Sequence, residues 1–152
     1  ELKTGFENSP FNKKNKLGFT LVELITVICI IAILSSIGIY SFGKIQANAR
    51  DSQRSSKLTV VYEALEKYYS QNGEYPSCAD MTADARTVSS QTLINIDLAA
   101  LSTPTNTSGT NSFICSEPTA DNFGYIGGGS EYTLEYFSES NQNVVSVKSR
   151  HS

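Results

Sequence analysis

The stretch that decides the fold is FTLVELITVICIIAILSSIGIYSFG, residues 19–43, in which Glu23 is the only charged residue. As a helix, these 25 residues would span roughly 37 Å, against about 30 Å for the hydrocarbon core of a bilayer. The rest of the chain is polar, so the sequence predicts a membrane segment joined to a soluble domain.

Residues 1–18 form a polar leader that ends in a basic cluster, Lys13, Lys14 and Lys16. Because lysines flanking a membrane helix stay on the cytoplasmic side, the leader is expected in the cytoplasm and residues 44–152 outside it. The predicted organisation is therefore a leader (1–18), a transmembrane helix (19–43) and an extracytoplasmic domain (44–152).

The helix is expected to continue beyond the membrane, from about Thr20 to Ser70, since no proline occurs between Phe11 and Tyr75. Apolar residues then recur with helical period, a stripe suited to covering a sheet: Leu58, Val61, Tyr62, Leu65, Tyr68 and Tyr69. Such a helix, roughly 75 Å long, is too long to be buried in so small a domain. Part of it must lie in lipid or against other subunits.

The remaining chain predicts a variable loop region over 77–112, with room for one short helix near 93–101, and a sheet over 113–148. Alternation in the last part predicts a three-strand antiparallel meander, to which residues 113–115 could add a fourth strand. The expected class is α+β, a long N-terminal helix packed on three or four antiparallel strands.

Composition argues against several functions. The chain has 12 Lys and Arg against 15 Asp and Glu, so bulk nucleic-acid binding is not expected. His151 is its one histidine, so a His-based catalytic site or a His-rich metal site is not expected. No cofactor and no enzymatic activity are predicted.

Two cysteines, Cys78 and Cys115, follow the export segment, and in an oxidising compartment they are expected to pair. The alternative is two small buried thiols. Cys29, inside the apolar run, is expected to pack as a small apolar residue.

The junction Lys16-Leu17-Gly18-Phe19-Thr20-Leu21-Val22-Glu23-Leu24-Ile25 resembles the processing site of type IV prepilins and of the pseudopilins of type II secretion. Residues 64–69, ALEKYY, and 73–76, GEYP, are similar to a helix end common in pseudopilins and related pilins. The last part of the chain matches only as a general order of helix then sheet.

The resemblance implies that prepilin peptidase cuts between Gly18 and Phe19 and then methylates the new Phe19 amine. Glu23 would guide assembly. The expected product is a type IV pilus subunit for adhesion, twitching motility or DNA uptake, with no enzymatic role. Its partners would be itself, prepilin peptidase, the cytoplasmic membrane and the pilus assembly machinery. The precursor would cross the inner membrane once, and the mature form would lie in the extracellular pilus.

Physical arguments agree with these roles. Gly18 has no side chain, so a protease can approach its backbone closely, and a cut before the apolar run keeps the helix as an anchor. A carboxylate at the bilayer centre costs about 2.5–3.5 kcal/mol. Glu23, near one end, could be relieved by the Phe19 amine of a neighbouring subunit. Alternatively, it snorkels to the headgroups.

Two rival functions stay open, a type II secretion pseudopilin and a single-pass anchored binding domain that does not polymerise. The chain departs from the best-known pilins because its membrane helix lacks proline and Cys115 lies well inside the chain.

For two groups of polar residues, the sequence allows more than one interpretation. Glu117, Asp121 and Asn122 are weak calcium candidates beside the interpretation of a solvated loop. A basic zone, defined as Lys44, Arg50, Arg54 and Lys57, could contact lipid headgroups, pair with acidic residues of another subunit, or simply face water. The acidic residues considered for that pairing are Asp121, Glu131, Glu135 and Glu139.

Overall fold

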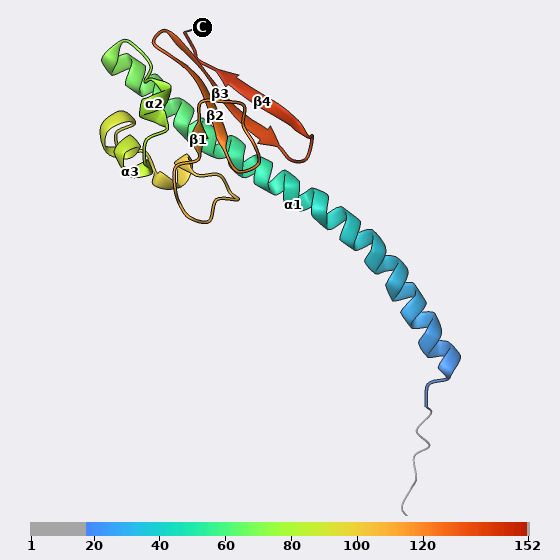
Figure 1. Ribbon diagram of the computed structural model, residues 1–152. Helices are drawn as coiled ribbons and strands as arrows, with labels where there is room; N and C mark the ends of the chain where they lie inside the picture. Colours follow the sequence, from blue (N-terminus) through green and yellow to red (C-terminus); the bar gives the residue numbers. More distant parts are fainter. Residues whose placement is uncertain (1–17, 152) are drawn as a thin grey trace, which may run out of the picture. The chain divides into compact units, whose positions relative to one another are not determined.

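The computed structural model describes residues 18–151, apart from the side chain of Tyr40. It divides into two compact units, Glu1–Ile39 and Tyr40–Ser152. Helix α1 (Leu21–Asn72) contributes to both units (Figure 1). Each unit is described by itself below.

The described part of the first unit is an apolar helical stretch whose side chains are all exposed. Two of its hydroxyls bond to the backbone of the same helix, since Thr26 Oγ1 donates to the Glu23 carbonyl at 2.9 Å and Ser36 Oγ to the Ile33 carbonyl at 2.7 Å. A helix that is apolar all round and satisfies its own polar groups suits a lipid environment. In the part of the chain that the structure describes, α1 is the one helix long and apolar enough to span a membrane, judged by length and composition.

In the second unit, α1 buries the predicted apolar stripe. Leu58, Val61 and Leu65 lie in the core, and the three tyrosines of the stripe pack against it. The helix ends at Asn72, where Gly73 takes a φ of +77° and its N–H donates to the Tyr69 carbonyl at 2.8 Å. A left-handed glycine is a common helix stop, because it has no Cβ to clash.

A four-stranded sheet in the order β1-β2-β3-β4 packs against this face of α1 and supplies further residues of the core. Its strands are β1 (Phe113–Ile114), β2 (Phe123–Gly128), β3 (Glu131–Ser138) and β4 (Asn143–Lys148). The β2–β3 and β3–β4 pairs are antiparallel, and the register puts Val145 opposite Tyr136 and Val147 opposite Leu134. The predicted α+β class of a long helix with a sheet is confirmed.

The prediction of a wholly antiparallel sheet was wrong, because β1 pairs parallel with β2. The meander argument holds only where a tight turn links neighbours. The longer connection from Cys115 to Asn122 lets the chain return and run in the same direction. A parallel pair of full-length strands would need a crossover of about a dozen residues or more. Because β1 has only two residues, the connection from Cys115 to Asn122 is long enough here.

The region between α1 and the sheet holds four short helical turns rather than the single helix expected. They are α2 (Cys78–Met81), α3 (Ala85–Thr87), the π-turn η1 (Val88–Thr92) and the 3₁₀ turn η2 (Leu98–Leu101). Ser77, Asp84 and Asp97 cap three of these turns with their side chains. Because such residues favour caps over helix interiors, they divide the region into short pieces.

A disulfide joins Cys78, at the start of α2, to Cys115, just after β1, with the Cα atoms 5.9 Å apart. It closes the region of short helical turns onto the sheet. In the chain-entropy model, a loop of this size contributes about 3–4 kcal/mol.

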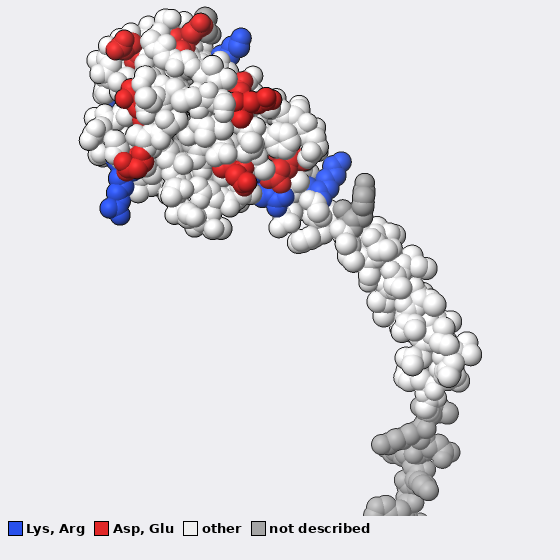
Figure 2. Space-filling view, viewed as in Figure 1, with Lys and Arg blue, Asp and Glu red and all other residues white. Residues whose placement is uncertain are grey.

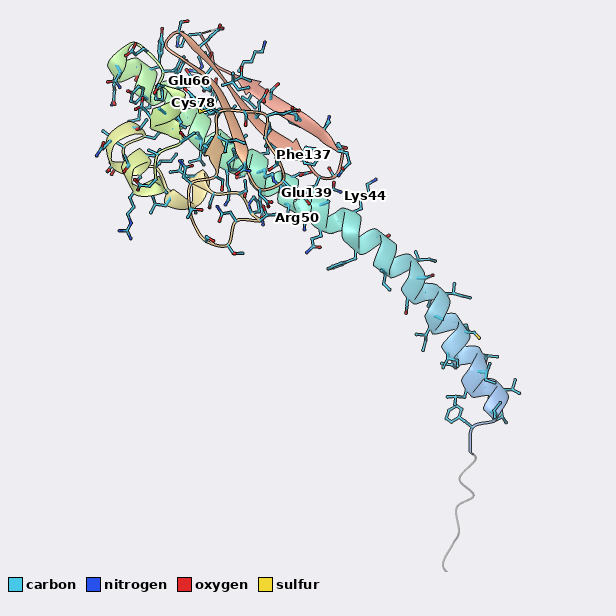
Figure 3. The ribbon with its side chains drawn as sticks, in the orientation of Figure 1. Lys44, Arg50, Glu66, Cys78, Phe137 and Glu139 are labelled. Atoms are coloured by element: carbon cyan, nitrogen blue, oxygen red, sulfur yellow. A yellow bond between two sulfur atoms is a disulfide. The ribbon has the colours of Figure 1, made fainter. Side chains whose placement is uncertain are left out.

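An ionic cluster attaches α1 to the turn between β3 and β4, and we call it the clasp: Arg50, Asp51, Arg54 and Glu139. Figure 3 labels Arg50 and Glu139 of this cluster. Arg50 Nε donates to Glu139 Oε2 at 2.9 Å, and Arg54 Nη1 donates to Asp51 Oδ1 at 3.1 Å. Arg54 also pairs with Glu139 through Nη2.

The clasp revises the interpretation of the basic zone. The partner of Arg50 and Arg54 is an acidic residue of the same chain, and Lys57 Nζ donates to the Ser102 carbonyl at 2.7 Å. None of the three alternatives raised from the sequence describes these residues. The sequence offered Glu139 as a partner only in another subunit, and its place beside Arg50 in the same chain was not predicted, because 89 positions separate the two residues.

Arg54 should be the residue of the clasp that is least tolerant of change, because its side chain is wholly buried. We expect Arg54→Ala to lower the free energy of unfolding by about 3–5 kcal/mol, since it leaves two carboxylates without their shared cation. Urea unfolding measures this change. Gln53→Ala, an exposed neighbour on the same helix, should stay within about 0.5 kcal/mol of the wild type. Equal losses in both variants would contradict a special role for Arg54.

Asp51 should make the free energy of unfolding depend on pH. Burial alone would raise its pKa, but donors from Ser140, Glu139 and Ser138 outweigh that effect and lower the pKa from 3.8 to about 2. A carboxyl whose pKa falls on folding adds stability that is fully present above pH 3.8 and is lost as the pH falls towards 2. We expect the melting temperature to decline more steeply over this range in the wild type than in Asp51→Asn. Parallel declines would count against the prediction.

Candidate functional site: the junction before the apolar helix

The predicted processing site lies at the described start of the chain. Gly18, Phe19 and Thr20 precede α1, and all three are exposed. Phe19 is 89% exposed, and a Cβ built on Gly18 would meet nothing within 4 Å. The backbone on either side of the expected cut is therefore open to a protease. The basic cluster Lys13, Lys14 and Lys16 lies outside the described residues.

Thr20 and Glu23 form a capping box at the start of α1. The Glu23 N–H donates to Thr20 Oγ1 at 3.2 Å, while Glu23 Oε2 accepts from the Thr20 N–H and from Thr20 Oγ1, each at 2.9 Å. A reciprocal pair of this kind satisfies donors that the first turn of a helix leaves free. Glu23 therefore has a structural use within its own chain.

The capping box could have been found from the sequence. Thr20-Leu21-Val22-Glu23 matches the pattern of Ser or Thr followed three positions later by Glu, directly before an apolar run. Sequence reasoning gave Glu23 a role between subunits and missed its bond to Thr20. The negative carboxylate in the first turn also suits the positive end of the helix dipole.

Glu23 is isolated among apolar side chains. Its neighbours Leu21, Val22 and Leu24 are exposed by 72, 67 and 62%. Figure 2 shows the charged side chains gathered on the second unit, while the face of the first unit in view carries none. A carboxylate in such surroundings has a strong preference for a cationic partner once water is removed.

The other predicted site residues belong to the second unit. Cys78 and Cys115 form the disulfide, and Cys29 is a free exposed thiol in α1. Glu117, Asp121 and Asn122 lie between β1 and β2, where the Asn122 side chain donates to Thr119 Oγ1 at 3.1 Å. Across residues 18–151, no group of three or more His, Cys, Asp or Glu side chains could hold a metal ion.

A second polar cluster, missed from the sequence, surrounds Glu66 on α1. Its carboxylate accepts from Tyr75 Oη at 3.1 Å, Tyr132 Oη at 3.2 Å and the Arg150 N–H at 3.2 Å. Burial, together with the bond to Glu66, raises the pKa of Tyr75 to about 12. These partners lie 9 to 84 positions from Glu66, so no local pattern could reveal them. The cluster fixes the last described residues to the helix.

These features define an α+β protein whose N-terminal anchor helix starts with a single carboxylate in a capping box. Residues 13–39 match the family model of the prokaryotic N-terminal methylation motif. The chain is also similar to the type IV major pilin protein PilA of Myxococcus xanthus (strain DK1622), with 39% identity over 72 residues.

The matched segment covers 47% of this chain but only 32% of that relative. No solved structure matches the chain significantly. Over part of its length, the chain is therefore similar to a type IV pilin and carries the methylation motif.

Replacing Thr20 should loosen the first turn of α1. We expect Thr20→Val to weaken the cap by about 0.5–2 kcal/mol, which corresponds to roughly two- to thirtyfold faster exchange of the Glu23 amide hydrogen. Hydrogen exchange followed by NMR in detergent micelles measures this rate. Thr20→Ser, which keeps the hydroxyl, should exchange nearly as the wild type does. Slow exchange in the valine variant would rule out the cap.

Proposed function

We propose that this chain is the structural subunit of a type IV pilus. The observation that carries the proposal is the placement of one carboxylate, Glu23, in the first turn of α1, where residues 21–39 are exposed and hold no other charge, within the methylation motif at residues 13–39. The pilin family is structural, and we infer that this chain likewise catalyses no reaction.

In the proposed pathway, the precursor lies in the cytoplasmic membrane as a single-pass protein with residues 44–152 outside. Prepilin peptidase cuts between Gly18 and Phe19 and methylates the Phe19 amine. The open backbone at this junction supports access by a protease. The helix over residues 19–43 is retained, first in the bilayer and then in the core of the filament.

Self-association follows from the surface of the anchor helix. Its apolar side chains have no partner in the described part of the first unit, so they require lipid or the same surface of other copies. Glu23 adds direction, because the new amine of a neighbouring Phe19 can neutralise it as the helices pack. The capping box holds the carboxylate in a defined position before that partner arrives.

The resulting filament would lie on the cell surface and serve adhesion, twitching motility or DNA uptake, with the assembly machinery as a further partner. The pseudopilin and the anchored binding domain are not favoured, since the similar curated protein is described as a type IV major pilin.

Substitution of Glu23 tests this function. We expect Glu23→Ala to abolish or strongly reduce filament yield, because the Phe19 amine loses its partner, while cleavage and methylation continue. Sheared filaments are quantified by sedimentation, and mass spectrometry reads the mature N-terminus. Glu63→Ala is the matched control, since Glu63 is an exposed glutamate of the same helix. Unchanged yield in Glu23→Ala, or an intact leader in the wild type, would refute the proposal.

A further inference from the structure

Lys44 is the only member of the basic zone whose partner the structure does not supply. Arg50 and Arg54 bind Glu139, and Lys57 binds the Ser102 carbonyl. Lys44 is exposed and makes no hydrogen bond or ion pair with any described residue. Figure 3 labels it on α1, on the N-terminal side of Arg50.

The residues beside Lys44 are apolar and uncovered. Phe42 is 66% exposed and Ile45 is 63% exposed, and both belong to the second unit, none of whose described residues covers them. Apolar and aromatic side chains next to a lysine, at the end of an apolar run, are the composition of a membrane interface. A lysine there can keep its stem in apolar surroundings and its ammonium among the headgroups.

The spacing along α1 fits this location. From Lys44 to Arg50, where the clasp begins, the helix advances six residues, or about 9 Å. Each headgroup layer of a bilayer is about 5–8 Å thick, the difference between the full bilayer and its hydrocarbon core shared by two sides. Residues 44–49 are therefore long enough to cross one headgroup layer and leave the clasp in water.

Charge favours the same arrangement. From Arg50 to Arg150 the chain carries seven Lys and Arg against twelve Asp and Glu, a net charge of −5. An anionic lipid surface repels such a domain, whereas it attracts an isolated lysine beside the bilayer. Among residues 42–49 of α1, Lys44 is thus the side chain that can bind lipid phosphates.

We propose that residues 42–49 form a membrane-interface stem, in which Phe42 and Ile45 enter the edge of the bilayer and the Lys44 ammonium binds lipid phosphates. The stem sets the depth of α1 in the membrane and keeps the clasp in water until the subunit enters a filament. This inference rests on the membrane-inserted stage of the proposed function and adds a lipid contact to it.

The full chain in vesicles provides the test. Cys29→Ser with Asn48→Cys places one reactive thiol on an exposed residue of the stem and leaves the Cys78–Cys115 disulfide in place. A nitroxide on that thiol reports depth through its relative accessibility to oxygen and to a water-soluble nickel chelate. In vesicles that contain phosphatidylglycerol, we expect Lys44→Glu to move the label toward water by about one helical turn, or about 5 Å. The shift should shrink in vesicles of phosphatidylcholine alone.

Lys67→Glu is the matched control, because Lys67 is an exposed lysine of α1 within the second unit. It changes the net charge equally and should leave the depth unchanged. If the label does not move in Lys44→Glu, or moves equally in Lys67→Glu, the proposal of a membrane-interface stem is refuted. The measurement needs no filaments, so it can fail while the pilus subunit stands, and it can succeed even if Glu23→Ala still forms filaments.

Discussion

Arg54 is the constraint on which the second unit depends. Its guanidinium is wholly buried, and a buried cation must be neutralised and hydrogen-bonded or the fold pays several kcal/mol. Three segments meet that requirement: Asp51 from the previous turn of α1, Glu139 from the turn after β3, and the carbonyl of Ala120 before β2, at 2.7 Å. These contacts fix where the helix lies against the sheet, beside the buried stripe residues Leu58, Val61 and Leu65.

The arrangement is not fully satisfied, since Arg54 Nε is the one buried side-chain nitrogen or oxygen of the described residues without a hydrogen-bond partner. The carboxylate of Asp51 is better supplied, accepting from the Ser138 hydroxyl and from the backbone of Glu139 and Ser140, each at 2.9 Å. The turn between β3 and β4 is thus organised around a side chain of the helix. The charges of the clasp fix the position of the turn, whereas the described partner of Glu23 is Thr20 of its own helix start.

Local patterns predicted the elements well. The period of Leu58, Val61 and Leu65 predicted the buried face of α1. Alternation in the last part of the chain predicted β2, β3 and β4, and Tyr132 and Leu134 of β3 are buried. Each of these signals arises within a few residues, so a reader of the sequence can recover it without knowing the fold.

What depends on contacts between distant segments could not be read in this way. The partner of Arg54 and the parallel pairing of β1 required the fold itself. Of the site, the sequence indicated the junction at Gly18 and Phe19 and the isolated Glu23, whose capping bond to Thr20 was readable but overlooked. The proposed cleavage, methylation and pairing between subunits depend on contacts with other molecules, which lie beyond what the fold of one chain contains.

The clasp has a mechanical consequence in the proposed filament. Tension that travels along α1 from the anchored end meets its first ionic links to the sheet at Arg50 and Arg54, which share the single carboxylate of Glu139. The disulfide between Cys78 and Cys115 ties other segments together and lies outside this path. Resistance to pulling should therefore vary with acidity and dissolved salt, and hardly at all with reducing agents.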